Sequence, residues 1–205
     1  MSFAHYKEER ESQQEPVDLI IGRGTGHRTP LNNQRAVCMD DDRYLIKSYK
    51  PFMADINSKE NPDIIASVTV PENMDCFPDA SVNDIYFERV YPTHIQTDLY
   101  AYFSVARILK KNGTFFAEFN NPIDDLKKTV IDIMNEIFKK FNIPLNASPC
   151  NDNDRSGLMP EPGIKCVKFD DFDPAPFRSD NNKLLKIVNC KLKSLKMQRG
   201  VRIYI

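Results

Sequence analysis

The stretch "VDLIIGRGTGHRTP", residues 17–30, decides the fold of this chain. A short apolar run at 17–21 leads directly into three glycines, Gly22, Gly24 and Gly26. Glycines after a strand let the backbone turn sharply, and they let a ligand approach the bare peptide. The spacing is neither the G-x-G-x-x-G of dinucleotide sites nor a Gly-Lys-Ser/Thr phosphate loop. Taken alone, such a cluster is more often a tight turn than a ligand site.

Short apolar runs alternate with helical patterns along the rest of the chain. We expect the runs to be buried parallel strands, because each is brief, β-branched or aromatic, and bounded by turn residues. After the first run, the expected strands are residues 36–40, 63–68, 84–90, 114–119 and 164–169. Apolar periodicity predicts one helix over 97–111, ended by the pair Asn112-Gly113, and a second over 121–141.

The remaining segments complete the expected organisation. Residues 1–15 are polar and predict a loose arm or a frayed helix before a single domain at 16–205. Residues 144–163 are rich in Pro, Asn and Gly and predict a loop. Residues 184–195 and 201–205 predict a terminal antiparallel strand pair. The chain as a whole therefore predicts a three-layer α/β sandwich, with a mostly parallel sheet that ends in an antiparallel strand pair.

A carboxylate follows the glycines at a distance that suits a nucleotide site. Asp40 ends the second expected strand, 18 positions after Gly22. In α/β nucleotide sites an acid roughly 20 residues beyond the glycines binds the ribose hydroxyls. The run from Asp40 to Asp42 alone is more often a solvated loop. Together with the glycines, Asp40 favours a site for an adenosyl ribose.

Composition excludes several classes of protein. Lys and Arg number 28 against 29 Asp and Glu, so no global field favours nucleic acid or acidic lipid as a partner. No apolar run approaches the ~18 residues of a membrane helix, and no apolar leader begins the chain. Five scattered cysteines without a C-x-x-C pair indicate neither a zinc site nor a disulfide framework. We expect a cytoplasmic protein without a metal, and the sequence leaves the oligomeric state open.

Four segments, in order, resemble the class I S-adenosylmethionine-dependent methyltransferases of the small "methyltransferase domain 11" kind. "VDLIIGRGTG" is similar to the first motif of that family, and "AVCMDDD" to its second strand with a ribose acid. Residues 61–90 resemble the stretch that leads through Phe-Pro-Asp into the fourth strand. "VARILKKNGTFFAEFNN" resembles the helix and fifth strand that follow. The resemblance spans about residues 17–120 and implies a three-layer Rossmann-like methyltransferase fold.

The resemblance also implies S-adenosylmethionine as the cofactor and methyl transfer to a small-molecule or protein acceptor. The glycines would approach the methionine moiety, Asp40 would hold the ribose, and the fourth strand would end where substrates bind. The implied cofactor residues are Gly22, Gly24, Gly26, Asp40, Asp41, Ser67 and Phe87. The candidates for a catalytic base are Glu88, His94 and His27, although a lone surface histidine is the commoner state.

Two departures from the family pattern leave a second function open. Ser67 or Val68 stands where the family usually has an acid near the adenine, and only residues 27–35 remain for a helix between the first two expected strands. These departures favour a methyltransferase-like protein that has lost catalysis and acts as a binding module. The basic segment 183–202 leaves nucleic-acid binding as a third alternative, although charged edge strands are more often simply solvated.

Overall fold

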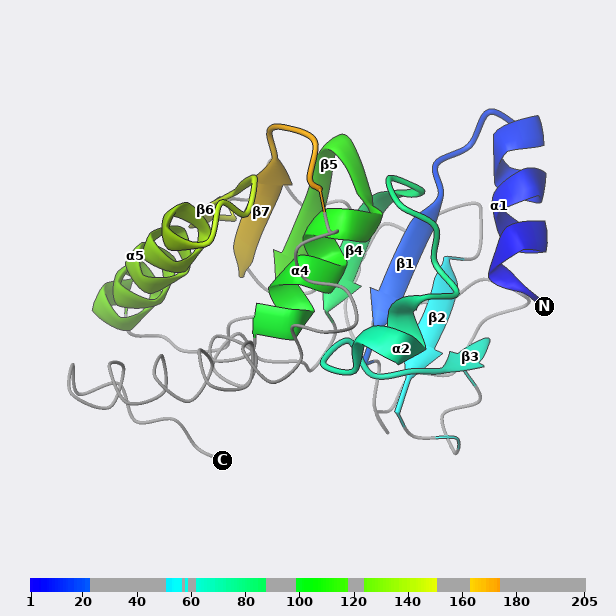
Figure 1. The fold of residues 1–205 in the computed structure, drawn as a ribbon, viewed down its shortest axis with the longest axis horizontal. Helices are drawn as coiled ribbons and strands as arrows, with labels where there is room; N and C mark the ends of the chain where they lie inside the picture. Colours follow the sequence, from blue (N-terminus) through cyan, green and yellow to red (C-terminus); the bar gives the residue numbers. More distant parts are fainter. Residues whose placement is uncertain are drawn as a thin grey trace, which may run out of the picture.

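A computed structural model of the chain describes residues 1–22, 51–56, 58, 62–87, 99–117, 124–150 and 163–173. These residues form a seven-stranded sheet and its packed helices (Figure 1). The strands are β1 Asp18–Ile21, β2 Phe52–Asp55, β3 Ile64–Ile65, β4 Val82–Phe87, β5 Leu109–Ala117, β6 Leu145–Pro149 and β7 Ile164–Lys168. The helices are α1 Phe3–Ser12, α2 Pro71–Met74, α4 Leu99–Ile108 and α5 Asp124–Lys140.

The strand order confirms the expected fold class. The sheet runs β3-β2-β1-β4-β5-β7-β6. Strands β1 to β5 run parallel to one another, whereas β7 is antiparallel to both β5 and β6. This is the mostly parallel sheet with an antiparallel end that a Rossmann-like methyltransferase fold requires. Within the described part of the chain, no helix is long and apolar enough to cross a membrane.

The central strands are buried on both faces, as a three-layer arrangement demands. Leu19 and Ile21 of β1 join the large core that the helices cover on one face of the sheet. Ile20, between them, points to the opposite face, where it packs with Tyr86 and Phe116. The last two rings stack with their centroids 5.2 Å apart. Burial on both faces explains why β1 is a continuous apolar run rather than an alternating one.

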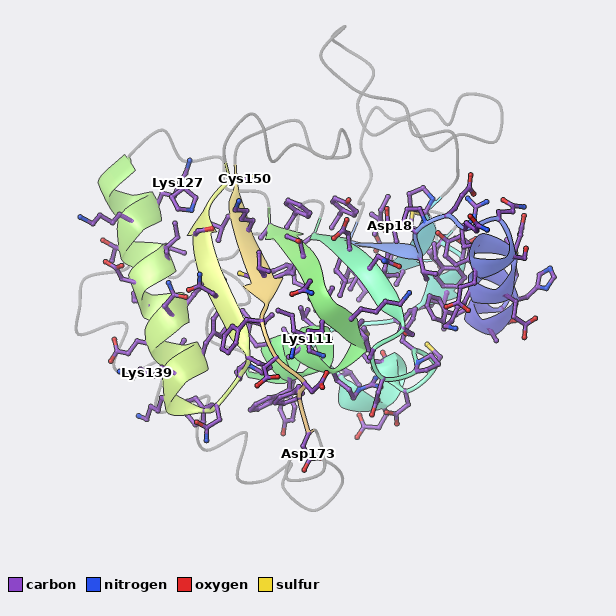
Figure 2. The ribbon with its side chains drawn as sticks, turned by 90° about the horizontal axis from the view of Figure 1, so that it is seen from above. Asp18, Lys111, Lys127, Lys139, Cys150 and Asp173 are labelled. Atoms are coloured by element: carbon purple, nitrogen blue, oxygen red, sulfur yellow. The ribbon has the colours of Figure 1, made fainter. Side chains whose placement is uncertain are left out.

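The amino terminus is a packed helix and not a loose arm. Helix α1 lies at the β2 end of the sheet, whereas α5 lies at the β6 end (Figures 1 and 2). Phe3 and Tyr6 are buried, and the Phe3 ring centroid lies 5.2 Å from that of Phe52 and 4.8 Å from that of Phe77. Burial raises the pKa of Tyr6, whose hydroxyl donates to the Asp18 carbonyl at 3.3 Å. Two apolar residues spaced i, i+3 thus anchor an otherwise polar segment.

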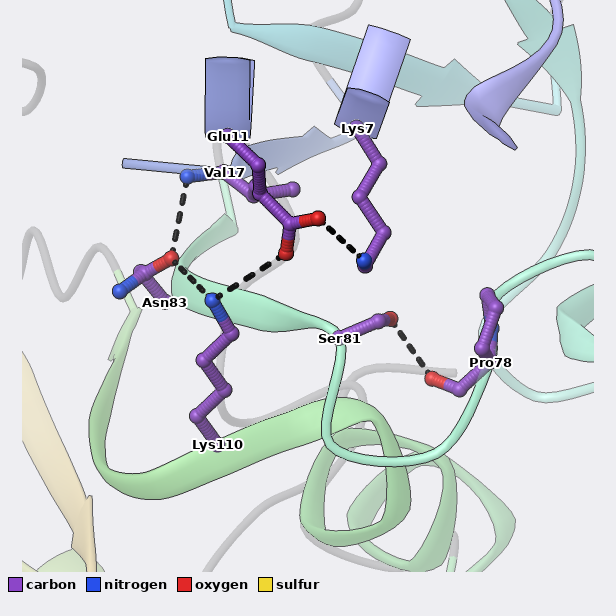
Figure 3. Close-up of polar contacts among 7 residues, drawn as sticks. All are labelled: Lys7, Glu11, Val17, Pro78, Ser81, Asn83 and Lys110. Carbon is purple, nitrogen blue, oxygen red and sulfur yellow. Dashed lines mark hydrogen bonds and ion pairs between the residues drawn. The ribbon is translucent and has the colours of Figure 1, made fainter. Parts of the chain in front are cut away.

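A polar network joins α1 to the edge of the sheet where the parallel strands begin (Figure 3). The Glu11 carboxylate accepts from Lys7 Nζ at 2.6 Å and lies 3.9 Å from Lys110 Nζ. Lys110 Nζ also donates to Asn83 Oδ1 at 3.1 Å, and the same oxygen accepts from the Val17 amide at 3.0 Å. One asparagine side chain therefore connects the start of β1 with β5, and Glu11 connects α1 with β5.

The helix expected over 97–111 ends earlier, at Ile108, and β5 begins at the next residue. The carbonyls of Arg107 and Ile108 accept hydrogen bonds from the amides of Ala80 and Ser81, at 2.8 and 2.9 Å. The last carbonyls of α4 therefore accept hydrogen bonds from the segment before β4 instead of from a further turn of the helix, and the helix ends there. The expected stop at Asn112-Gly113 lies instead inside β5.

The antiparallel end of the sheet is confirmed, and its described strands are β6 and β7. Strand β7 coincides with the expected strand at 164–169 and pairs with β6, which lies inside the segment predicted as a loop. The amide of Ala147 and its carbonyl bond the Asn135 side chain of α5 at 2.8 and 2.9 Å. The two hydrogen bonds from Asn135 stabilise β6, whose sequence lacks the β-branched residues that would have predicted a strand. The expected pair at 184–195 and 201–205 lies outside the described residues.

Candidate functional site

The carboxyl ends of the parallel strands form the candidate site. From β1 the chain adds β2 and β3 on one side, and it then adds β4 and β5 on the other. The strand order therefore reverses between β1 and β4. In open α/β sheets ligands bind at this switch point, outside the carboxyl ends of the strands. The described residues at that edge are Gly22, Asp55, Ser67 and Phe87.

Gly22 leaves β1 in a conformation that only glycine adopts readily. Its φ is 73°, in the left-handed region, where a Cβ would crowd the backbone. Its amide donates to the Ala54 carbonyl at 3.0 Å, which holds Gly22 against the end of β2. The positive φ gives a physical reason for a glycine directly after the strand at 17–21. Gly24 and Gly26 lie outside the described residues.

The strand next to β1 is Phe52–Asp55, so the prediction that residues 36–40 form it is wrong. The two neighbours of β1 in the sheet are β2 and β4, and Ile21 is in register with Ala54 of β2. The crossover from β1 to β2 therefore spans residues 22–51, thirty residues instead of the short stub expected. A parallel crossover needs a dozen or more residues, so this one is of ordinary length.

Asp55 occupies the position that the sequence assigned to Asp40. It is the last residue of β2, only 3% exposed, and it stands one residue beyond the hydrogen bond between Gly22 and Ala54. Its carbonyl accepts from the Ala66 amide at 3.0 Å, so the ends of β2 and β3 are joined as well. Asp40 and Asp41 lie outside the described residues.

The signal for Asp55 was present in the sequence. The segment "FMAD" is a short apolar run that ends in an acid, as "AVCMD" is. Asp55 lies 33 positions after Gly22, so the expected spacing of roughly 20 favoured the earlier acid. The spacing reflects the length of the crossover, and an inserted loop changes it without changing the sheet.

Ser67 follows β3 at the same edge of the sheet. Its hydroxyl lies 2.9 Å from that of Thr69, and its amide donates to Asn73 Oδ1 at 3.1 Å. Its carbonyl accepts from the Val70 amide at 3.1 Å, which closes a turn into α2. The side chain is half-buried and therefore accessible from the edge. The hydroxyl can donate or accept, whereas an acid at this position would only accept.

Phe87 ends β4, but its side chain faces the core. The residue has no exposed surface, and its ring centroid lies 4.5 Å from that of Phe115 in an edge-on packing. The Phe87 ring is therefore not accessible to a ligand at this strand end. The candidate bases Glu88, His94 and His27 lie outside the described residues.

Comparison with solved structures finds matches of low sequence identity and modest TM-score. The chain is similar to the CurJ carbon methyltransferase, at 11% identity over 76% of this chain and 49% of that one, with a TM-score of 0.43. It thus spans about half the length of that neighbour. An S-adenosylmethionine-dependent methyltransferase from Archaeoglobus fulgidus is 12% identical, over 100% of this chain and 90% of its own, with a TM-score of 0.41.

A spermidine synthase from Thermotoga maritima is 19% identical, over 91% of this chain and 69% of its own, also at a TM-score of 0.41. No protein-family model and no curated protein matches the sequence. The fold assignment therefore rests on the strand order and directions of the sheet, which are those of a class I methyltransferase fold.

Proposed function

We propose that this chain binds S-adenosylmethionine at the carboxyl ends of β1 and β2 and transfers its methyl group to an acceptor. The adjacency of Gly22 and Asp55 carries the proposal. One supplies a left-handed turn with bare backbone, and the other supplies a carboxylate on the next strand. Vicinal ribose hydroxyls need an acceptor at that place, and a carboxylate can accept from both.

The residues present fit such a ligand. The backbone from Gly22 through the further glycines Gly24 and Gly26 would approach the methionine moiety, because no Cβ blocks it. Asp55 would accept from the ribose hydroxyls, in place of Asp40. Ser67, at the end of β3, would border the adenine with a hydroxyl that is already hydrogen-bonded to Thr69.

Methyl transfer depends mainly on how the acceptor is positioned. Bound S-adenosylmethionine supplies a methyl group made electrophilic by the sulfonium sulfur. The chain has to hold the acceptor in line with the carbon–sulfur bond and to keep water out. A base is needed only for an acceptor that must lose a proton, and Glu88, His94 and His27 remain the candidates for that role.

The alternative is a methyltransferase-like binding module without catalysis. The sequence favoured this alternative through a shortened crossover between the first two strands, and the crossover from β1 to β2 spans residues 22–51 instead. The second departure from the family pattern remains, since Ser67 stands where the family usually has an acid. Nucleic-acid binding by the segment 183–202 concerns residues outside those described, and no described feature favours it.

Calorimetry with S-adenosylmethionine and S-adenosylhomocysteine tests the proposal. We expect micromolar binding of both, since each carries the adenosyl ribose that Asp55 would hold. No binding at millimolar ligand would contradict the proposal. Incubation with methyl-labelled S-adenosylmethionine and a desalted cell extract then separates the two functions. An enzyme transfers label to an acceptor, whereas a binding module retains the ligand unchanged.

A further inference from the structure

The Arg107 side chain of α4 is buried and clamps the segment that follows α2. Its Nη2 donates to the Met74 carbonyl at 2.6 Å, and its Nη1 donates to the Phe77 carbonyl at 2.7 Å. The same Nη1 forms an ion pair with Asp79 Oδ1 at 2.6 Å. Arg107 is only 8% exposed. A planar guanidinium with several fixed donors can satisfy three such acceptors together, which a lysine ammonium on a flexible stem cannot do as well.

Backbone bonds complete the clamp on this side. The carbonyls of Arg107 and Ile108 hold the amides of Ala80 and Ser81, at 2.8 and 2.9 Å. Ser81 Oγ donates back to the Pro78 carbonyl at 2.6 Å (Figure 3). The chain from the end of α2 to the start of β4 is therefore fixed to the last turn of α4.

A side chain of α2 contacts the candidate site. Asn73, next to Met74, accepts from the Ser67 amide through Oδ1 at 3.1 Å. The residue before Ser67, Ala66, donates its amide to the Asp55 carbonyl at 3.0 Å. Hydrogen bonds, joined by residues adjacent in the chain, thus connect Arg107 through α2 to Ser67 and to Asp55. Coupling between separated groups travels through such contiguous packed contacts.

We propose that Arg107 is a positioning residue for the ligand site. It holds α2 in the place where Asn73 orders Ser67, and through Ala66 it keeps the end of β3 against Asp55. The proposal rests on the proposed function for its ligand. It assigns to α4 a role in affinity, beyond the packing that any buried helix residue provides, because preorganised site residues lose less freedom on binding.

The test compares Arg107→Gln with Asn135→Ala. Asn135 also bonds the backbone of one strand twice, but it does so on β6, at the far end of the sheet from β2 and β3. Both variants should lower the midpoint of thermal unfolding. In the ligand-free protein, hydrogen exchange of the Ser67 amide should rise about 10-fold in Arg107→Gln and stay unchanged in Asn135→Ala. The Kd for S-adenosylhomocysteine should likewise rise about 10-fold in Arg107→Gln only.

If Arg107→Gln folds and the hydrogen-exchange rate of its Ser67 amide is unchanged, the inference is overturned. The same holds if wild type binds S-adenosylhomocysteine and Arg107→Gln binds it with the same Kd. Arg107→Lys should recover part of the affinity, because it keeps the charge and some of the donors. If Arg107→Gln does not fold, Asp79→Ala removes one acceptor of the clamp and should give the same changes at about 3-fold. A wild type that binds no ligand overturns the proposed function instead, and the exchange result then decides the positioning role by itself.

Discussion

The amide of Gly22 donates a hydrogen bond to the carbonyl of Ala54, so the residue that follows β1 is held against the residue before Asp55. The bond brings two features 33 positions apart in the sequence to neighbouring places on one edge of the sheet. Parallel pairing of Ile21 with Ala54 sets the same register. The glycine turn and the acid are therefore parts of one structure, whatever the length of the crossover between them.

Gly22→Ala should destabilise the protein and weaken ligand binding. With φ at 73°, an alanine would be forced into the left-handed region, at a cost of about 1–2 kcal/mol. Thermal unfolding would show a midpoint lower by roughly 2–8 °C for a chain of this length. Ligand affinity, measured at a temperature where the variant is folded, should fall too. A variant with wild-type stability would contradict the left-handed turn.

Gly113→Ala should destabilise the protein without touching the site. A Cβ on Gly113 would lie 2.4 Å from the Asn83 carbonyl oxygen and 2.9 Å from that of Lys110, and both are backbone atoms that cannot swing away. We expect a loss of about 1–3 kcal/mol in the free energy of unfolding, measured by chemical denaturation. Lys111→Ala, which removes an exposed ion pair with Asp170, is the control and should leave the free energy of unfolding close to that of wild type.

Asn135→Ala should weaken the edge of the sheet at β6. The variant leaves the amide and carbonyl of Ala147 without the two bonds that the side chain supplies, at a cost of about 1–3 kcal/mol. Hydrogen exchange should show faster opening of β6, with β1 and β4 protected as before. Asp132→Ala, on an exposed position of α5, should leave both measurements unchanged. Equal protection of β6 in the two variants would exclude this role for Asn135.

The contribution of Glu11 should depend on pH. The hydrogen bond from Lys7 lowers the pKa of Glu11 below its usual value of 4.5. The ionised form is therefore favoured in the folded state, so its stabilisation is complete above pH 4.5 and is lost as pH falls through the lowered pKa. Glu11→Gln should thus unfold at a lower temperature than wild type at pH 7, and the gap should close on acidification towards pH 3. A gap that widens in acid would reverse the sign of this argument.

The sequence predicted most of the sheet that the structure describes, whereas most of the predicted site residues lie outside the described residues. Apolar runs such as 17–21 are long enough, and bounded clearly enough, to predict buried strands, and the periodicity of α5 predicted its helix. The sequence did not predict β6, because its backbone is bonded by a side chain of α5, and no local sequence pattern indicates such a tertiary contact. The strand beside β1 was misplaced because spacing along the chain depends on the length of the crossover, and the assignment of the ribose acid to Asp40 or to Asp55 stays a prediction.

The most direct test of the central claim is titration of S-adenosylhomocysteine into wild type, Asp55→Asn and Asp40→Asn by calorimetry. All three proteins should show the same fold by circular dichroism. We predict micromolar binding by wild type, binding weaker by about 10- to 100-fold in Asp55→Asn, and a Kd within about 2-fold of wild type in Asp40→Asn. Binding that survives Asp55→Asn but disappears in Asp40→Asn, or no binding by wild type at millimolar ligand, would contradict the account.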